Sequence, residues 1–196
     1  HDQSLKSIVH WNPYLYLNIY ITDLRSGLLG YAQDIHLLSS QPAQDGVVID
    51  KDCLAINNHP YYNAGRTLTH EVGHWLGLDH TWGPNQHSDC FEDDGVDDTP
   101  VCNDEYYTHT PNCSSPMQCS QQNQNLGLTS TRQIENYMDY SDDLCMNMFT
   151  QGQKDLMFDY LYYSRYDIWQ PSNPALNING NPNVSYGPSG CVPATN

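Results

Sequence analysis

The sequence predicts an α+β domain in which a small sheet comes first along the chain and helices follow it. Three short segments rich in aromatic and β-branched residues precede residue 51, and helical periodicity first appears after residue 63. A long stretch rich in Asp, Asn, Pro and Cys then separates this first helix from a second helix near residue 150. At 196 residues, the chain is long enough for one domain, with or without two lobes, and for a core of its own.

The segments before residue 51 are typical of strands. Residues 14–21 (YLYLNIYI) are rich in aromatic and β-branched side chains, alternate partly between apolar and polar, and end before Asp23. Residues 27–33 form a short run with flanking glycine, and residues 46–50 form another. We therefore expect these segments to pair in one small sheet.

Residues 63–67 open a helical pattern. Leu68, Val72, Trp75 and Leu76 fall at i, i+4, i+7 and i+8, which gives the helix one apolar stripe that faces a core. Gly77 comes next, and glycine commonly ends a helix because it adopts positive φ without a steric penalty. We expect the helix to end there.

Periodicity is absent from residue 81 to residue 128, where we expect cross-links rather than a core to hold the chain. A last helix is expected from Thr150 to about Ile168, with Leu156, Tyr160 and Tyr163 at helical spacing. Residues 171–196 are rich in Pro, Asn, Gly and Ser, which is typical of a surface segment or a linker stub.

The charge balance excludes two classes of partner. The chain has 23 acidic and 7 basic residues, a formal net charge of −16. Nucleic-acid binding needs a basic surface, and so does binding to an anionic membrane. No apolar run approaches the roughly 20 residues of a membrane-spanning helix. Such an acidic surface favours solubility, and it could also attract cationic peptides or divalent cations.

The seven cysteines, in a chain with so little lysine, indicate an oxidising compartment. No two cysteines have the CxxC spacing of a thiolate zinc site, so disulfides are the better interpretation. An odd number leaves at least one thiol outside them. Asn112 and Asn183 begin glycosylation sequons. The chain begins at His1, without an initiator methionine or a signal peptide, so we expect a processed fragment of a secreted protein.

The segment HEVGHWLGLDH, residues 70–80, has the spacing of a metal site. His70 and His74 lie four residues apart, so their rings project from one helix face and can reach one ion at about 2.0–2.1 Å. Glu71 lies beside them, and Gly77 allows a sharp turn that returns His80 to the same ion. Chance is the alternative, but five specified positions arise by chance in fewer than about one in a thousand such chains.

This segment matches HExxHxxGxxH, the zinc signature of the metzincins, which also need a downstream turn that contains methionine. Residues 136–140 (NYMDY) supply such a turn. The sequences of residues 65–69, 81–83 and 145–150 are similar to those of the pappalysin family, in its cytophagalysin or ulilysin-like branch. The resemblance extends from about residue 16 to residue 154.

The resemblance implies a metzincin-type catalytic domain of two lobes over residues 1–170. The upper lobe, to about residue 77, would hold a small mixed sheet and the active-site helix. The lower lobe, residues 78–170, would be irregular, tied by disulfides, and would end in a helix. Metzincin upper lobes resemble a five-stranded sheet with a backing helix, so an N-terminal strand and helix are expected to be missing or abbreviated here.

The resemblance also implies roles for individual residues. The implied zinc ligands are His70, His74 and His80. Glu71 would activate a zinc-bound water as general base and later protonate the leaving amine. Met138 would form an apolar floor beneath the zinc. Tyr140 would hydrogen-bond the metal or the developing oxyanion, although a buried structural tyrosine is the alternative.

The acidic residues at positions 93–99 surround Gly95, and oxygen ligands of this kind suit calcium. In the resemblance, Asp94 and Thr99 ligate calcium through side chains and Asp97 through its carbonyl. A solvated acidic loop is the alternative. Some similar enzymes accept Arg or Lys after the scissile bond through an acidic pocket residue. Asp142 and Asp143 are the candidates here, again with solvated loop acids as the alternative.

The family pattern further suggests the disulfides Cys90–Cys119 and Cys113–Cys145. It leaves Cys53, Cys102 and Cys191 without assigned partners.

These observations together predict a secreted, monomeric zinc endopeptidase that acts on peptides or proteins, with substrate extended along residues 27–33. One alternative is a zinc hydrolase of non-peptide amides. The other is a calcium-stabilised binding module with a vestigial zinc site. Glu71 speaks against the binding module, because a purely structural metal site does not need an adjacent carboxylate that does not bind the metal.

Overall fold

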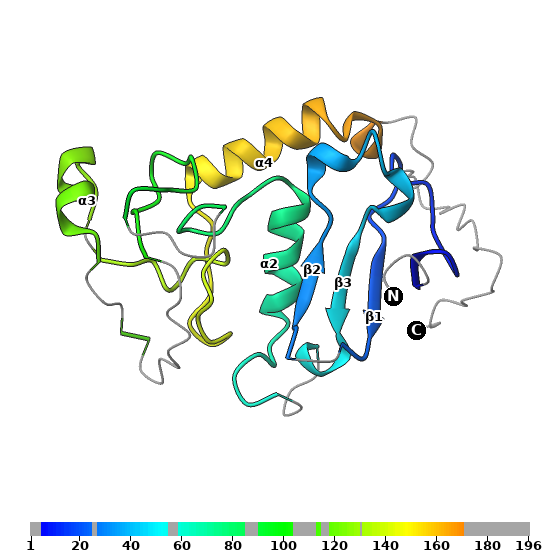
Figure 1. Cartoon of the computed structure of the whole chain (residues 1–196), viewed down its shortest axis with the longest axis horizontal. Coiled ribbons are helices and arrows are strands. Elements are labelled where there is room, and N and C mark those ends of the chain that lie inside the picture. The colour runs from blue at the N-terminus through cyan, green and yellow to red at the C-terminus, as the bar shows by residue number, and fades with distance from the viewer. Residues whose placement is uncertain are drawn as a thin grey trace, which may run out of the picture.

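The computed structural model describes residues 5–24, 27–54, 59–84, 90–103, 113–114, 118–129 and 131–170. Figure 1 shows a three-stranded sheet on one side of helix α2 (Arg66–Trp75) and mostly irregular segments on the other side. Helix α4 (Gln151–Tyr163) runs across both halves. We refer to the half with the sheet as the upper lobe and to the irregular half as the lower lobe. The predicted α+β architecture with two lobes is confirmed.

The sheet is mixed, with the strand order β1-β3-β2. Strand β1 (Ile19–Thr22) is parallel to β3 (Val47–Asp50), and β2 (Gly30–Ala32) is antiparallel to it. All four residues of β3 are buried, as expected of a central strand. Because β2 pairs with β3 on one side, its other edge faces the lower lobe across α2 (Figure 1).

The predicted strand over residues 14–21 is wrong in its first half. The backbone N–H groups of Leu15 and Tyr16 both donate to the carbonyl oxygen of Asn12, at 3.0 Å, which makes a turn. The Tyr16 ring packs edge-on against Trp11, with centroids 4.9 Å apart. The aromatic residues that raised the strand propensity therefore pack locally, and pairing begins only at Ile19.

Helix α2 packs on the sheet through the predicted stripe. Val47, Ile49, Cys53 and Trp75 form the buried core, and Leu68, Val72 and Leu76 pack against it. The helix ends at Trp75, and Gly77 has φ +89°. A side chain at Gly77 would collide with the ring of Tyr160 from α4, so the position excludes a Cβ as well as favouring positive φ.

Helix α4 begins with a capping box, in which Thr150 and Gln153 exchange side-chain-to-backbone hydrogen bonds. The predicted end near Ile168 is too late, because Arg165 has φ −121° and ψ 35°, and a 3₁₀ turn, η4 (Tyr166–Trp169), follows it. The buried Arg165 guanidinium bonds Asp45 at 2.7 and 3.2 Å and lies 3.5 Å from the Trp75 ring centroid. The helix therefore ends close to the point where the Arg165 side chain turns into the core to bond Asp45.

Helix α3 (Ser120–Leu126) lies in the stretch that was predicted to be irregular, so that prediction is wrong for these residues. Its only apolar residue is Leu126, which is 59% exposed, so it has no apolar stripe to signal it. The helix is attached instead by Asn123, which is fully buried. Its side chain accepts from the N–H of Val101 and donates to the Val101 carbonyl. The described residues also form the 3₁₀ turns η1 (Ile35–Leu37), η2 (Pro42–Gln44) and η3 (Lys51–Cys53).

Disulfides join Cys90 to Cys119 and Cys113 to Cys145, which are the two pairs that the resemblance implied. Cys53 and Cys102 are both buried, and neither belongs to these two disulfides. Cys191, the two sequons and the whole of residues 171–196 lie outside the described residues. Among the residues that the structure describes, no helix combines the length and apolar character needed to cross a membrane.

Candidate metal centre

Three imidazoles converge where α2 ends. His70 and His74 project from one face of α2, and the turn at Gly77 brings His80 to them. Their Nε2 atoms lie 3.0 Å apart for His70 and His74, 3.1 Å for His74 and His80, and 3.2 Å for His70 and His80. Within the described parts of the chain, this is the only such group of three metal-binding side chains.

These distances fit a zinc ion. Three nitrogens at about 2.0–2.1 Å from a tetrahedral zinc lie about 3.3–3.4 Å from one another, so small shifts of the rings would complete the site. The Nε2 atoms of His70 and His74 cannot hydrogen-bond each other, because both are acceptors. His70 Nδ1 donates to the Tyr137 carbonyl and His74 Nδ1 to the Leu78 carbonyl, both at 2.7 Å, because a carbonyl only accepts. In their neutral forms, His70 and His74 therefore each present an Nε2 lone pair to the centre.

The three rings are held in the neutral form. Burial, and then the neighbouring His74, lowers the pKa of His70 to about 3. Burial also lowers the pKa of His74 and, together with the other two rings, that of His80. Neutral imidazole is the form that binds zinc, so the protein environment favours the binding state over most of the pH range.

His80 is oriented by aromatic contacts. Its ring stacks on Trp82, with centroids 4.5 Å apart and planes at 11°, and Trp82 is 2% exposed. Tyr140 meets His80 edge-on at 4.7 Å and lies 5.5 Å from the His70 ring, so it lies beside two of the three imidazoles. Its half-buried position next to the rings fits a role in the site.

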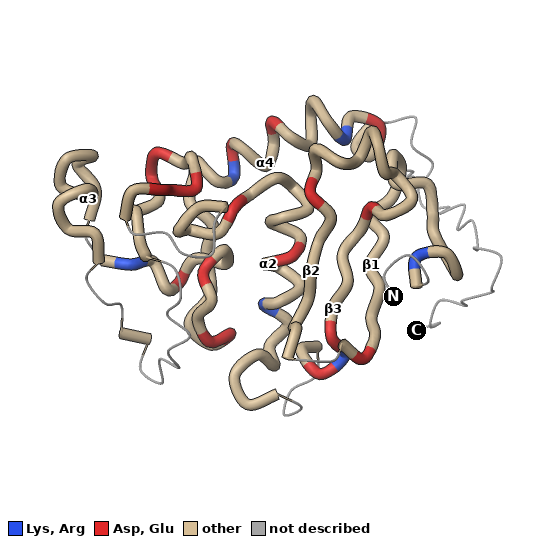
Figure 2. The backbone as a smooth tube through the Cα atoms, viewed as in Figure 1, with Lys and Arg blue, Asp and Glu red and all other residues tan. Residues whose placement is uncertain are grey.

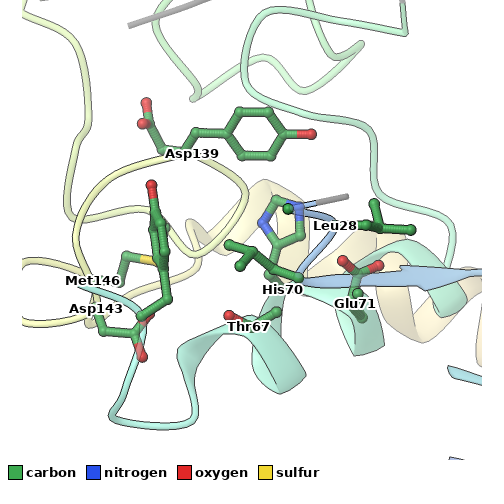
Figure 3. A pocket seen from close by; sticks show the side chains of 12 residues that line it. Leu28, Thr67, His70, Glu71, Asp139, Asp143 and Met146 are labelled. Atoms are coloured by element: carbon green, nitrogen blue, oxygen red, sulfur yellow. The ribbon is translucent and has the colours of Figure 1, made fainter. Parts of the chain in front are cut away.

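Glu71 and His70 point from α2 into the same pocket (Figure 3). The Glu71 side chain is buried, and this burial raises its pKa to about 8. Met138, which is fully buried, lies against the same helix, and a Cβ at Gly73 would collide with its sulfur atom. The methionine therefore packs against α2 one residue before His74.

The pocket beside the triad has a volume of about 130 Å³. It is lined from both lobes, by Gly27, Leu28, Leu29, Gly30, Tyr62, Thr67, His70, Glu71, Asp139, Tyr140, Asp143 and Met146. Figure 3 shows Asp143 and Met146 on one side of the pocket and Leu28 and Glu71 on the other. The pocket thus lies next to the face of α2 that carries His70 and against the segment that leads into β2.

Asp143, but not Asp142, lines this pocket. The Asp143 Oδ2 accepts from the backbone N–H of Ala64 at 2.7 Å and of Arg66 at 3.2 Å. Its Oδ1 is buried and has no hydrogen-bond partner. Burial raises the pKa of this carboxyl. Asp142 is also buried, at 8% exposure, but away from the pocket lining.

The predicted calcium residues lie in a loop whose acidic residues gather beside the start of α4 (Figure 2). Asp98 ties the loop to the helix, since its Oδ2 accepts from the Gly152 N–H at 2.9 Å. Asp94 is buried, with Oδ1 accepting from the Val96 N–H at 3.1 Å. Its Oδ2 and the Thr99 hydroxyl are buried without a hydrogen bond of good geometry. Burial raises the Asp94 pKa to about 7, although the neighbouring Thr99 hydroxyl acts to lower it. Asp97 is exposed.

Sequence reasoning missed several contributors to the site. Trp82 lies two residues after His80 but carries no signal for stacking, and Tyr137 contributes only its carbonyl oxygen. Asp139 lines the pocket and is paired with the buried Arg132, with Nε and Oδ2 2.6 Å apart. The Tyr137 contact joins segments 67 residues apart, and the other two depend on which way a side chain faces, so no local pattern encodes these roles.

The comparisons with known proteins agree with this geometry. The family described as "Pregnancy-associated plasma protein-A", a peptidase family, matches residues 2–162. The chain belongs to this family. A metallopeptidase family implies a catalytic metal, and the triad is the group in the described structure that fits it.

Family relatives of known name are extracellular metalloproteases of fungi. The chain is 37% identical to one from Arthroderma otae over 155 residues, which cover 78% of this chain and 53% of the relative. It is 36% identical to one from Colletotrichum graminicola over 164 residues, covering 81% and 54%. The chain therefore spans about half the length of the curated relatives it matches.

A solved structure of similar fold is mature mirolysin from Tannerella forsythia in complex with a cleaved peptide. It is 36% identical, with a TM-score of 0.71, and the match covers 85% of this chain and 62% of that one. Mirolysin in complex with a small compound matches with a TM-score of 0.67 and 37% identity, over 81% and 57% of the two chains. The metzincin fold predicted for the chain is confirmed.

Proposed function

We propose that the protein is a secreted zinc endopeptidase that hydrolyses internal bonds of peptides or proteins. The observation that carries this proposal is the placement of the three Nε2 atoms within 3.2 Å of one another, next to a pocket that Glu71 lines. His70, His74 and His80 would hold the zinc. The residues that match the family end before residue 170, so we propose residues 1–170 as the catalytic domain, divided into lobes near residue 77.

The side chains divide the chemistry between them. Zinc, when bound by the three nitrogens, supplies Lewis acidity that acidifies water and polarises a peptide carbonyl. Although burial raises the pKa of Glu71, the bound cation would favour its carboxylate form, which takes a proton from the attacking water as the water oxygen forms the new bond to the carbonyl carbon. The Tyr140 hydroxyl donates a hydrogen bond to the developing oxyanion. Protonated Glu71 then delivers its proton to the amine nitrogen as the C–N bond breaks.

The substrate would lie extended along the edge of β2 opposite to β3. Gly27 to Gly30 line the pocket, and β2 is bonded to β3 on its opposite side, so its backbone can pair with a substrate strand. The complex of mirolysin with a cleaved peptide supports peptide substrates for this fold. Asp143, whose Oδ1 is buried in the lining without a partner, would favour Arg or Lys after the scissile bond.

We also propose that calcium stabilises the lower lobe. Asp94 and Thr99 would ligate it by side chain, since each has a buried oxygen atom without a hydrogen bond of good geometry. Asp97 would contribute its backbone carbonyl, which agrees with its exposed side chain. A cation would satisfy both orphaned oxygen atoms and would favour the ionised form of Asp94.

An extracellular location and a monomeric state complete the proposal. The curated fungal relatives are named extracellular metalloproteases, and the two disulfides agree with an oxidising compartment. Peptides or proteins are the proposed partners. The net charge of −16 disfavours nucleic acids and anionic membranes.

The test is Glu71→Gln, which keeps the size of the side chain and removes its basicity. Proteolysis of a denatured-protein substrate should fall by about 10²–10⁴-fold, the usual contribution of a general base. Zinc content, measured by atomic emission, should remain at one ion per chain. The matched control is Asp159→Asn, which removes an exposed carboxylate on α4 and should change neither quantity.

Three results would contradict the proposal. Full proteolysis by Glu71→Gln would exclude this residue as the base. Zinc binding by the unaltered protein without cleavage of any peptide in a diverse library would favour the binding-module alternative, and turnover of small amides alone would favour the non-peptide hydrolase.

A further inference from the structure

A chain of buried hydrogen bonds connects the start of α4 to the turn that contains Met138. The Gln153 Oε1 accepts from the Thr150 N–H at 3.0 Å and from the Asn136 side-chain amide at 2.9 Å. The Asn136 Oδ1 in turn accepts from the Met138 N–H at 2.9 Å. Gln153 and Asn136 are both fully buried, so water cannot replace these bonds.

The N–H that bonds the Asn136 side chain and the carbonyl that accepts from His70 belong to the same peptide group, the one between Tyr137 and Met138. Tyr137 lies between Asn136 and Met138, and its carbonyl accepts from His70 Nδ1 at 2.7 Å. On its other side, the Tyr137 N–H donates to the Met148 carbonyl at 2.8 Å. The direction of the Tyr137 carbonyl therefore depends on two anchors, the Asn136 turn and the pairing with Met148.

We propose that the amide pair Asn136–Gln153 positions the metal ligand His70, so that the first turn of α4 determines the affinity of the site for zinc. The inference rests on the proposed zinc centre. Gln153 and Asn136 touch no ligand atom, and they act through the Tyr137 carbonyl, which sets the tautomer and the orientation of the imidazole. Outer partners of metal-binding histidines commonly change metal affinity by 10–100-fold when they are removed.

The capping box allows this role to be separated from ordinary helix stability. Gln153 serves both the cap and the link to Asn136, whereas the Thr150 hydroxyl serves only the cap, by accepting from the Gln153 N–H at 3.1 Å. Thr150→Ala therefore weakens the start of α4 but leaves the link to Asn136 in place. Gln153→Met has a similar length, favours helix, and removes the acceptor that both donors share.

The experiment measures the zinc dissociation constant of the whole chain by competition with a chromophoric chelator, together with the visible spectrum of the cobalt(II)-substituted protein. Gln153→Met should bind zinc about 10-fold more weakly or worse, with shifted cobalt bands. Thr150→Ala should have a lower Tm but the affinity and the cobalt spectrum of the unaltered protein. Gln153→Glu, whose carboxylate still accepts from both donors, should bind zinc with an affinity within about threefold of that of the unaltered protein.

Unchanged affinity and spectrum in Gln153→Met would overturn the inference, as would equal losses in Thr150→Ala and Gln153→Met. If Gln153→Met does not fold, Asn136→Ala is measured instead, with the same expected loss. If neither folds while Thr150→Ala does, the pair is a folding requirement and the positioning role is wrong. Failure of the unaltered protein to bind zinc would instead overturn the proposed function itself.

Discussion

Each imidazole of the centre is held by a different kind of neighbour. A carbonyl from another segment orients His70, a carbonyl four residues along the chain orients His74, and the face of Trp82 orients His80. None of these three orienting contacts is a carboxylate, although the nearby charge of Asp79 acts to raise the pKa of His74. The affinity of the site should therefore depend on backbone placement, which makes remote anchors of the backbone important.

Asp143 provides a prediction about specificity at this scale. Asp143→Asn keeps an acceptor for the N–H groups of Ala64 and Arg66 but removes the charge. The kcat/KM for a peptide with Arg after the scissile bond should fall by about a hundredfold, or about 2.7 kcal/mol, typical of a truncated buried charge pair. A matched peptide with Leu at that position should change little, because it makes no ion pair.

Asp142→Asn is the control, because it removes the adjacent carboxylate, which lies outside the pocket lining. An equal decline for the Arg and Leu peptides would show that Asp143 is structural.

The preference for Arg over Leu should also depend on pH. Burial raises the pKa of Asp143, so as pH is lowered this carboxyl should become protonated at a higher pH than an exposed aspartate would. The preference of the unaltered protein should decline over the same range. Protonation removes the charge that attracts the basic residue.

Helix α2 packs against the sheet with one face and presents two of the metal-binding histidines on another. Its apolar stripe packs on β2 and β3, while His70 and His74 face the lower lobe, where Met138 fills the space beside Gly73. Glycine inside a helix costs about 1 kcal/mol relative to alanine. Glycine is nevertheless required here, because a Cβ at position 73 would collide with the Met138 sulfur.

Gly73→Ala therefore tests packing against propensity. Helix propensity alone predicts that this substitution stabilises the protein, whereas the collision with Met138 predicts a loss of about 1–3 kcal/mol. Urea unfolding of the zinc-loaded protein measures the difference. Combining Gly73→Ala with Met138→Ala should show a favourable coupling energy, since the second change removes the collision. A more stable Gly73→Ala variant would refute the close approach.

At the scale of the whole molecule, α4 joins the two lobes. In its first turn, Gln153 bonds Asn136 in the segment that contains Met138. Just beyond its end, Arg165 bonds Asp45 in the upper lobe. There Arg165 and Asp45, both fully buried, form a two-bond ion pair, and Trp75 donates its indole N–H to the same carboxylate at 3.0 Å. The core of the sheet, the end of α2 and the end of α4 thus meet at one charged contact.

Arg165→Met should cost about 3–5 kcal/mol of unfolding free energy, because it leaves the Asp45 carboxylate buried without its cation. Chemical unfolding of the zinc-loaded chain measures this cost. The double variant Asp45→Asn with Arg165→Met should lose less than Arg165→Met alone, since no unpaired charge remains. Lys154→Met, which removes an exposed cation from the same helix, is the control and should change stability by less than about 0.5 kcal/mol.

Calcium should stabilise the folded chain through the lower lobe. Added at about a hundred times its dissociation constant, it should contribute about 2.7 kcal/mol, seen as a rise in the Tm of the zinc-loaded protein. Asp94→Asn should abolish the rise, because it removes a ligand charge. Asp97→Asn should keep the rise, because only its carbonyl is used. Loss of the effect in Asp97→Asn, or a rise in Asp94→Asn, would place the cation elsewhere.

Much of the site is visible in the sequence, because its parts are local. The i, i+4 spacing of His70 and His74, the adjacent Glu71 and the glycine that turns the chain toward His80 are set within 11 consecutive residues of one helix and its end. Helical geometry and the turn at Gly77 place these groups together. The apolar stripe of α2 follows from the same periodicity, and the two disulfides follow from family resemblance.

Only the tertiary structure decided which residues support the site. It selected Asp143 rather than Asp142 for the pocket, gave the Tyr137 carbonyl to His70, buried Arg165 on Asp45, and attached the polar helix α3 through Asn123. Each contact joins segments that lie far apart along the chain or depends on which way one side chain faces. Periodicity describes the geometry within one element, whereas these contacts depend on how the elements are placed against one another.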